Sequence, residues 1–314
     1  MVKQFINEIQ KKNKTAEIKL IFTNNWKDID YIKRVKSLYK KGFYFFIGPY
    51  DSKQTQLSLY SLKNKYAYFL SLFSTDTRLY YYSDNFFSLV FSNKKQAKRI
   101  REFLFKQKRF KRLTIIYSKK DQYANNLVFW LDRYLDSYPI IEKNKIDYEH
   151  LLINKNMFWN NLMTKKHYIL FISSNHQDYQ VLFYYLKYYK KKIKCNFLFP
   201  DSFHGITNKL KKTVNLREKL YWFTYFNKKS YQKSWIKKYF IKNTPHDLYY
   251  IYLGIKIALQ SYQKALKAPM NLVDILERSD FIIDRTVHKF SHHHFRITPV
   301  HTYFLNKKGN LILK

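Results

Sequence analysis

The sequence predicts an α/β fold built on mostly parallel sheets flanked by helices. Short apolar runs alternate along the chain with longer stretches whose apolar residues recur at helical spacing. Several of these runs are apolar throughout, which is typical of parallel strands covered on both faces. With 314 residues, the chain is long enough for two lobes of about 150 residues, each with its own core.

The expected elements follow one another in strand–helix–strand order. The strands are short runs rich in Ile, Leu, Phe and Tyr, expected at residues 18–22, 43–47, 66–72, 113–117, 167–172, 196–199 and 220–225, with an edge strand at 140–147. Helices are expected at residues 2–12, 29–39, 94–108, 126–135 and 178–189, with another before residue 66. The family resemblance given below implies two more, at residues 231–240 and 248–266. Residues 296–313 are expected to form a hairpin with its turn at 308–310. This order predicts parallel sheets with right-handed crossovers.

Small polar residues follow two neighbouring strands in the stretch from residue 41 to residue 79. The strand at 43–47 ends at Gly48 and Pro49 and is followed by Ser52, while the strand at 66–72 is followed by Ser74 and Thr75. In open α/β sheets, ligands bind in the crevice at the carboxyl ends of the strands. The sequence therefore predicts a cleft for a small polar molecule at this edge.

The same stretch resembles the type I periplasmic binding proteins, and within them the leucine/isoleucine/valine-type amino-acid receptors. The resemblance rests on IGPYDS at 47–52 and LSLFSTDTRL at 70–79, and it continues in Gln-Ala at 96–97 and in the strand at 113–117 with Tyr123 after it. Leu72 stands where the family has Pro, Phe73 where it has a small residue, and Ala124 where it has Gly. The resemblance implies a two-lobed fold over nearly the whole chain.

This resemblance also implies how the chain is divided. Lobe 1 is expected to comprise residues 1–110 and about 227–290, and lobe 2 residues 111–226 and about 291–314. The family has a strand and a ligand-contacting loop before its first helix. In this sequence, the part that resembles the family begins at that helix, residues 2–12. We therefore expect that the first strand of lobe 1 is missing, so that the natural protein is longer at its N-terminus or this chain is a degraded copy.

The resemblance assigns ligand-binding roles to residues at matching positions. Ser52 and Thr75, in a loop that also contains Ser74, would hold the carboxylate of an amino acid. Asp201 and Tyr123 would meet its ammonium group. For Asp201 a second interpretation is open, because Asp after a strand is often a helix N-cap.

The function implied by the resemblance is capture of a small polar, amino-acid-like ligand between two lobes for an ABC importer, in the periplasm or as a cell-surface lipoprotein. Its partners would be the membrane subunits of the transporter or a sensory protein. A regulatory protein of the same fold, like the penicillin-binding protein activators, is an alternative, and a pocket filled by Phe73 would favour it. No signal peptide is visible, because residues 1–7 lack an apolar core, and no run approaches the roughly 18 apolar residues of a membrane span.

Composition leaves a third interpretation open. The net charge of +37 suggests a nucleic-acid or anionic-surface binder, although the Lys residues are spread along the chain instead of gathering on one helix. Cys195 lies in an apolar run and is expected to be a buried, inert thiol. The sequence contains no recognised nucleophile, phosphate-loop or zinc-protease pattern, so we expect neither an enzyme nor a cofactor.

Five histidines crowd into one short stretch near the C-terminus: His288, His292, His293, His294 and His301. Imidazole is a common metal ligand. No Cys or carboxylate nearby completes a convincing ligand set, so an exposed turn is the expectation for this segment and a metal site the alternative.

Overall fold

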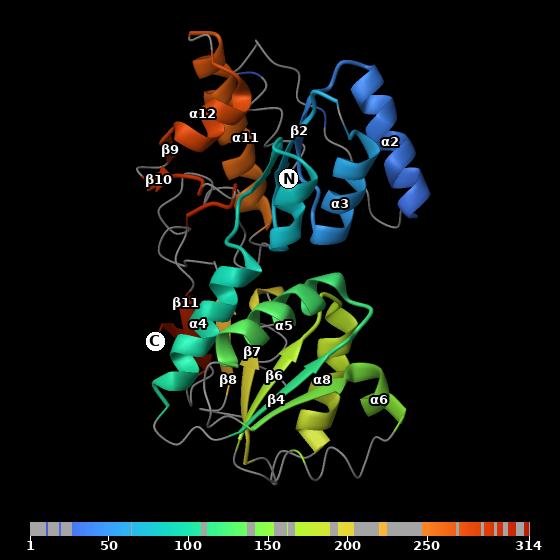
Figure 1. Cartoon of the computed structure of the whole chain (residues 1–314), viewed down its shortest axis with the longest axis vertical. Coiled ribbons are helices and arrows are strands. Elements are labelled where there is room, and N and C mark those ends of the chain that lie inside the picture. Colours follow the sequence, from blue (N-terminus) through green and yellow to red (C-terminus); the bar gives the residue numbers. More distant parts are fainter. Residues whose placement is uncertain are drawn as a thin grey trace. The chain divides into compact units, whose positions relative to one another are not determined.

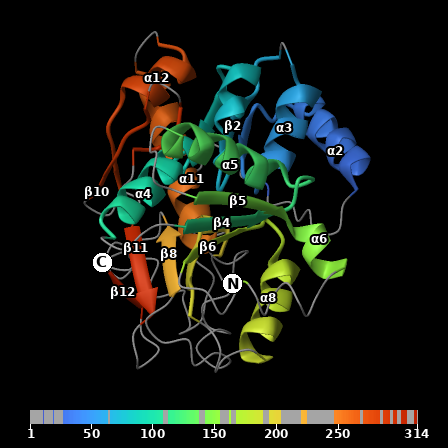
Figure 2. The same ribbon diagram turned by 60° about the horizontal axis from the view of Figure 1, so that its bottom comes forward.

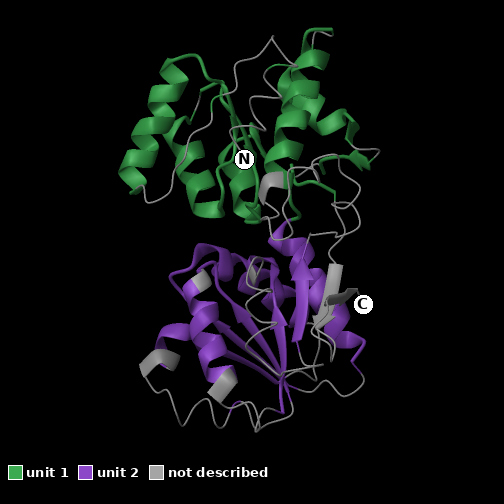
Figure 3. Cartoon of the chain, turned by 180° about the vertical axis from the view of Figure 1, so that it is seen from behind, with its two compact units in different colours: residues 1–91, 227–298 green, residues 92–226, 299–314 purple. Residues whose placement is uncertain are grey.

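The computed structural model divides the chain into two units (Figures 1 and 3), unit 1 comprising Met1–Phe91 with Asn227–Thr298 and unit 2 comprising Ser92–Phe226 with Pro299–Lys314. The residues that the structure describes are 11, 19, 27–63, 65–107, 112–136, 142–153, 162, 167–188, 194–203, 220–224, 247–267, 270–283, 286–291, 294–297, 301–305 and 311–313. The unit boundaries differ from those expected from the sequence, because the helix after residue 92 packs within unit 2.

The sheet of unit 1 contains three described parallel strands in the order β1-β2-β3, namely β1 (Phe45–Ile47), β2 (Tyr68–Ser71) and β3 (Phe86–Ser88). Paired residues of neighbouring strands point to the same face. Phe69, paired with Phe46 and Phe86, therefore lies on one face, and Leu70, paired with Ile47 and Phe87, lies on the other. Both faces carry large apolar side chains, as the sequence predicted for a sheet covered on both sides.

Helices cover the two faces of this sheet. On the Phe69 face, residues of α2 (Asp28–Lys40) and α3 (Ser52–Ser61) share a buried apolar cluster with Phe69 and Phe86. On the other face lies α11 (Asp247–Ala265), whose Gly254 approaches Ile47, Leu70 and Leu89. Unit 1 also contains η1 (Thr77–Tyr82), α12 (Leu272–Arg278), β9 (Phe281–Ile283) and β10 (Thr286–His288).

The sheet of unit 2 contains seven described strands, in the order β12-β11-β8-β7-β6-β4-β5. The strands are β4 (Arg112–Tyr117), β5 (Glu142–Asp147), β6 (Tyr168–Ile172), β7 (Asn196–Phe199), β8 (Leu220–Thr224), β11 (His301–Leu305) and β12 (Leu311–Leu313). The pairs from β5 to β8 are parallel, whereas β11 pairs antiparallel with both β8 and β12, as Figure 2 helps to follow. The predicted edge strand is confirmed as β5, and the predicted C-terminal hairpin as β11 and β12.

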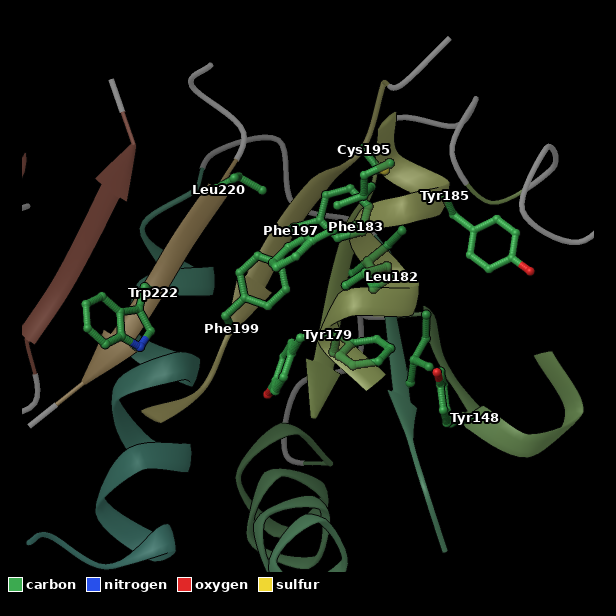
Figure 4. Close-up of a cluster of buried hydrophobic side chains, with 14 residues drawn as sticks. Tyr148, Tyr179, Leu182, Phe183, Tyr185, Cys195, Phe197, Phe199, Leu220 and Trp222 are labelled. Atoms are coloured by element: carbon green, nitrogen blue, oxygen red, sulfur yellow. The ribbon is translucent and has the colours of Figure 1, made fainter. Parts of the chain in front are cut away.

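Aromatic residues make up eight of the fourteen side chains of one buried cluster of unit 2. Figure 4 shows Phe197 and Phe199 of β7 facing Leu182 and Phe183 of α8 (His176–Tyr188). Cys195 belongs to the same cluster and is fully buried, which confirms the expected buried thiol. Other described helices of the unit are α4 (Asn93–Phe105), α5 (Gln122–Leu135), α6 (Tyr148–Ile153) and η2 (Asp201–Phe203). Much of the Tyr and Phe content of the sequence is therefore core.

Several expected elements lie outside the described residues: the helix at 2–12 apart from residue 11, most of the strand at 18–22, the helix at 231–240 and the turn at 308–310. The expectation of a missing first strand stays a prediction for this reason. Among the described helices, none is both long and apolar enough to cross a lipid bilayer.

Candidate functional site

The carboxyl edge of the unit 1 sheet brings together the loops that follow β1 and β2. Because these strands are paired in parallel, the segment from Gly48 to Asp51 and the segment from Leu72 to Asp76 leave the sheet side by side. Gly48 has a positive φ of 89°, and a Cβ there would come within 3.3 Å of Leu72 Cδ1. A glycine at this turn therefore allows the chain to leave β1 close to β2.

A network of hydroxyl groups fixes these two loops to each other. The Oγ of Ser71 donates to the carbonyl oxygen of Pro49 at 2.7 Å and lies 2.6 Å from the Oγ of Ser74. The Ser74 hydroxyl is also 2.5 Å from Thr55 Oγ1, which contacts the Asp51 carbonyl at 2.8 Å. Ser74, predicted from the sequence as a ligand contact, thus uses its hydroxyl within this network.

Two hydroxyl groups at the same edge are not used in this way. Thr75 is fully buried, and its Oγ1 has no hydrogen-bond partner among the described residues. Ser52 is the first residue of α3, and no hydrogen bond of its hydroxyl is found in the described part of the chain. The carboxylate of Asp51 caps the helix by accepting from Gln54 N at 2.8 Å, which leaves the first backbone N–H groups of α3 available. This edge therefore offers hydrogen-bond donors to an anionic group.

Aromatic rings adjoin this edge. The ring of Phe73 makes edge contacts with Tyr50 at 4.9 Å and with Tyr250 of α11 at 5.2 Å between centroids. Phe73 is half-buried and Tyr50 is exposed. The bulk of Phe73 is therefore accommodated in part by packing against other aromatic residues of unit 1.

In unit 2, two predicted site residues lie in direct contact. The hydroxyl of Tyr123, in the first turn of α5, donates to Asp201 Oδ1 at 2.5 Å, and Gln96 Nε2 of α4 donates to the same oxygen at 2.7 Å. Burial raises the pKa of the Asp201 carboxyl, while these two hydrogen bonds act in the opposite direction. Burial, followed by the charge of Asp201, raises the pKa of Tyr123 well above its usual value.

Asp201 also shows features of its second interpretation, that of a capping residue. It begins η2 directly after β7, and the backbone N–H groups of Asp201 and Ser202 at this helix start act to lower the pKa of its carboxyl. The structure thus places Asp201 at the carboxyl edge of the sheet, holding α4, α5 and η2 together through one buried carboxylate.

Gln96 was not among the residues predicted for the site. It lies on the buried face of α4 with Asn93, Ala97 and Ile100, the i, i+3, i+4 and i+7 spacing of a helix face directed inward. A polar residue at such a position needs a buried partner. That signal in the sequence could have identified Gln96.

The histidine stretch differs from the expected exposed turn. His288 and His294 are only 3% and 2% exposed, respectively, so the expectation was wrong for these two residues, whereas His292 and His293 lie outside the described residues. His294 stacks on Phe87 at 4.2 Å, and its ring nitrogens lie 2.8 Å from the Phe86 carbonyl oxygen and 2.5 Å from Glu277 Oε1. No group of three or more His, Cys, Asp or Glu suited to a metal ion occurs in the described part of the chain.

Comparisons with solved structures show the fold class. Leucine-binding protein LivK of Thermotoga maritima superposes with a TM-score of 0.76 at 12% identity, covering 100% of this chain and 92% of that chain. LivJ of Streptococcus pneumoniae, solved with isoleucine, gives a TM-score of 0.74 at 13% identity over 98% of this chain and 92% of that one. A solute-binding protein of an ABC transporter from Rhodopseudomonas palustris, solved with 3,4-dihydroxybenzoic acid, gives a TM-score of 0.77 at 11% identity. The match covers 100% of this chain and 90% of that chain.

This chain therefore has the two-lobed type I periplasmic binding protein fold, as the resemblance implied. No protein-family model matches the chain, and no curated protein matches it by sequence.

Proposed function

We propose that this protein is a solute-binding protein that captures a small, amino-acid-like ligand, with Ser52 and Thr75 holding the carboxylate of the ligand. The observation that carries the proposal is Thr75 Oγ1, a buried hydroxyl without a partner beside a network whose other hydroxyls are bonded. Buried polar groups are almost always hydrogen-bonded in native proteins. A ligand carboxylate at this edge would complete the hydrogen bonding of Thr75.

Asp201 and Tyr123 are proposed to serve the ammonium group of such a ligand. The carboxylate of Asp201 is oriented by Tyr123 and Gln96, and orientation by fixed donors is a usual property of binding residues. Solved proteins of this fold carry leucine, isoleucine or benzoic acid derivatives, so the choice of an amino acid rests on the sequence resemblance and on these four side chains.

The proposed cellular role is delivery of the solute to an ABC importer outside the cytoplasmic membrane, with the membrane subunits of the transporter, or a sensory protein, as partner. It is supported by the transporter-linked names of the structural neighbours. No catalytic step is proposed, since the residues at the two sheet edges are assigned to binding alone.

A regulatory protein of the same fold is the second candidate. The half-buried ring of Phe73, held between Tyr50 and Tyr250 at the edge of the sheet, is the observation that favours it. Under this alternative, no small solute binds and the partner is a protein.

The test is a thermal-shift screen of amino acids and related acids with the wild-type protein and two matched variants. A ligand that binds the native state raises its stability by mass action. Thr75→Val replaces the unpartnered hydroxyl with a methyl group, so we expect unchanged or higher stability without ligand and a lost ligand response.

Thr55→Val is the control for the Thr75 variant, because it removes a hydroxyl of the same edge that is fully hydrogen-bonded. We expect the opposite pattern, a lower melting temperature with the ligand response retained. Absence of any stabilising solute for the wild type would contradict the proposal and favour the regulatory candidate.

A further inference from the structure

Arg296 is a buried arginine at the carboxyl edge of the unit 1 sheet. Arg296 is only 7% exposed. Its backbone N–H donates to the carbonyl oxygen of Ser88, the last residue of β3, at 2.9 Å. The guanidinium lies 5.7 Å from the ring centroid of Tyr250, and its Nη1 donates to His288 Nδ1 at 2.8 Å. The side chain is therefore held in one place by an aromatic ring and an imidazole.

The charge of Arg296 is not balanced by a carboxylate. No Asp or Glu forms an ion pair with it in the described part of the chain, and its Nε is buried without a hydrogen-bond partner. Arg78 of the same unit gives the contrast, because its Nη2 lies 2.7 Å from the buried carboxylate of Asp76. Burying a charge is costly unless it is paired, so an unpaired buried guanidinium requires an explanation.

His288 does not supply the missing negative charge. Burial and, to a smaller extent, the positive charge of Arg296 lower the pKa of His288 to about 3, so the imidazole is neutral and accepts the hydrogen bond from Arg296. Its Nε2 is likewise buried without a partner among the described residues. The pair thus has a net charge of +1 and two buried nitrogen atoms without partners.

Arg296 lies close to the hydroxyl groups of the proposed binding site. Across this edge, β2 is next to β3, and the segment of Arg296 is next to β3 on its other side. The Oγ of Ser88 in β3 donates to the carbonyl oxygen of Ser74 after β2 at 2.7 Å. Two strand spacings amount to about 10 Å, a gap that an arginine side chain and a small ligand can span. The ring contact between Tyr250 and Phe73 at 5.2 Å connects the guanidinium to the Thr75 loop.

We infer that Arg296 binds an anionic group of the solute, in addition to the carboxylate that Ser52 and Thr75 hold. This inference rests on the proposed function and deepens it, because an amino-acid-like solute with a second anionic group is an acidic amino acid. A neutral aliphatic side chain would leave the guanidinium and the unpartnered Nε–H without an acceptor. An anionic side chain satisfies both with a charge-assisted hydrogen bond.

Two matched ligand pairs, L-glutamate with L-glutamine and L-aspartate with L-asparagine, test the inference, because each pair differs mainly in one negative charge. Calorimetric titration of the wild-type protein should give an affinity for one of the acids at least tenfold above that for its amide. Arg296→Gln should bring that ratio to within about twofold, chiefly because the acid binds more weakly. Arg278→Gln is the control, since it removes an equal charge from an exposed position of the same unit.

Arg296→Lys keeps the charge and serves as the second variant if Arg296→Gln does not fold. It should retain a preference for the acid that is weaker than in the wild type. Equal affinity of the wild type for acid and amide, or a preference that survives in Arg296→Gln, would overturn the inference and leave the proposed function standing.

Succinate, which carries two carboxylates and no ammonium group, separates failure of the inference from failure of the proposed function. If no amino acid binds but succinate does in an Arg296-dependent manner, anion recognition by Arg296 stands and the amino-acid-like ligand is wrong. If neither succinate nor any amino acid binds, both proposals fall.

Discussion

At the scale of single residues, two opposing effects act on the pKa of the buried Asp201 carboxyl. Burial disfavours its charged form, and the donors on Tyr123 and Gln96 favour it. A carboxylate that is hydrogen-bonded by two helices also fixes the helices, which makes Asp201 a structural residue whether or not a ligand binds. The structural role of Asp201 is therefore measured together with its partner Tyr123.

Tyr123→Phe should lower the free energy of unfolding by roughly 1–3 kcal/mol, because Asp201 loses a buried hydrogen-bond donor. In the double variant with Asp201→Asn the loss should be smaller than the sum of the two single losses, since the residues share one interaction. Urea denaturation measures all three values. Tyr184→Phe is the control for the hydroxyl, because Tyr184 is 69% exposed and should change stability little. Additive losses in the double variant would show that the contact contributes nothing to stability.

His288 makes the free energy of unfolding depend on pH. Its pKa is lowered in the folded protein, so between pH 6.5 and about 3 the unfolded chain binds a proton that the native protein does not. Stability should therefore fall on acidification through this window, by at most about 1.4 kcal/mol per pH unit from this residue.

His288→Gln keeps a hydrogen-bond acceptor for Arg296 and removes the titrating group. Denaturation curves from pH 7 to pH 3 should show a shallower decline for this variant than for the wild type. Parallel curves for the two proteins would contradict the assignment of a neutral, buried His288.

At the scale of elements, α11 packs so closely on the unit 1 sheet that one position admits only glycine. A Cβ at Gly254 would lie 2.7 Å from Ile47 Cγ2 and 3.3 Å from Leu89 Cδ1. Ile47 is β-branched and stiff, so its methyl group cannot move aside without rotating the whole side chain. The close approach of this helix leaves little space between it and the sheet.

Gly254→Ala should destabilise the protein by roughly 1–3 kcal/mol through overpacking, although alanine is the better helix former. Adding Ile47→Leu removes the methyl group at Cγ2 and should restore part of the loss. Thermal denaturation of the single and double variants tests both expectations. A stabilising effect of Gly254→Ala would show that the helix is less tightly packed than the structure indicates.

Comparison of the expected and observed elements shows how much of the structure can be predicted from patterns in the sequence. The strands β1, β4, β6 and β7 were predicted within two residues, because each consists mainly of apolar residues. The same patterns missed β9 and β10, which are strands of only three residues, too short to show a clear period. Buried polar contacts were the hardest to predict, since Gln96 and Asp201 lie 105 residues apart and nothing local indicates that they meet. The buried positions of His288 and His294 depend in the same way on the sheet and on Arg296 rather than on their neighbours in sequence.

At the scale of the whole molecule, the charge of +37 is the feature that the proposed function does not use. Part of it is neutralised locally, as where Lys143 and Lys145 meet Asp132 on the surface of unit 2. Excess positive charge of this size attracts any polyanion through counterion release, without recognition of sequence. It is therefore compatible with a solute-binding function.

Duplex DNA should accordingly bind weakly, with no sequence preference and with an affinity that falls steeply as salt rises. Fluorescence anisotropy with two unrelated duplexes, at low and at physiological salt, measures both properties. Nanomolar binding of one duplex over the other at physiological salt would contradict this expectation and favour the nucleic-acid alternative.

Calorimetric titration of the best solute from the screen is the sharpest test of whether Ser52 and Thr75 bind the ligand. We expect one site per chain for the wild type. For the double variant Ser52→Ala, Thr75→Val, we expect an affinity at least tenfold lower, about 1.4 kcal/mol or more. The Thr55→Val protein, whose lost hydroxyl belongs to the scaffold, should bind as the wild type does. Equal affinity in the wild type and in the Ser52, Thr75 double variant would contradict the account, because the ligand would then bind elsewhere.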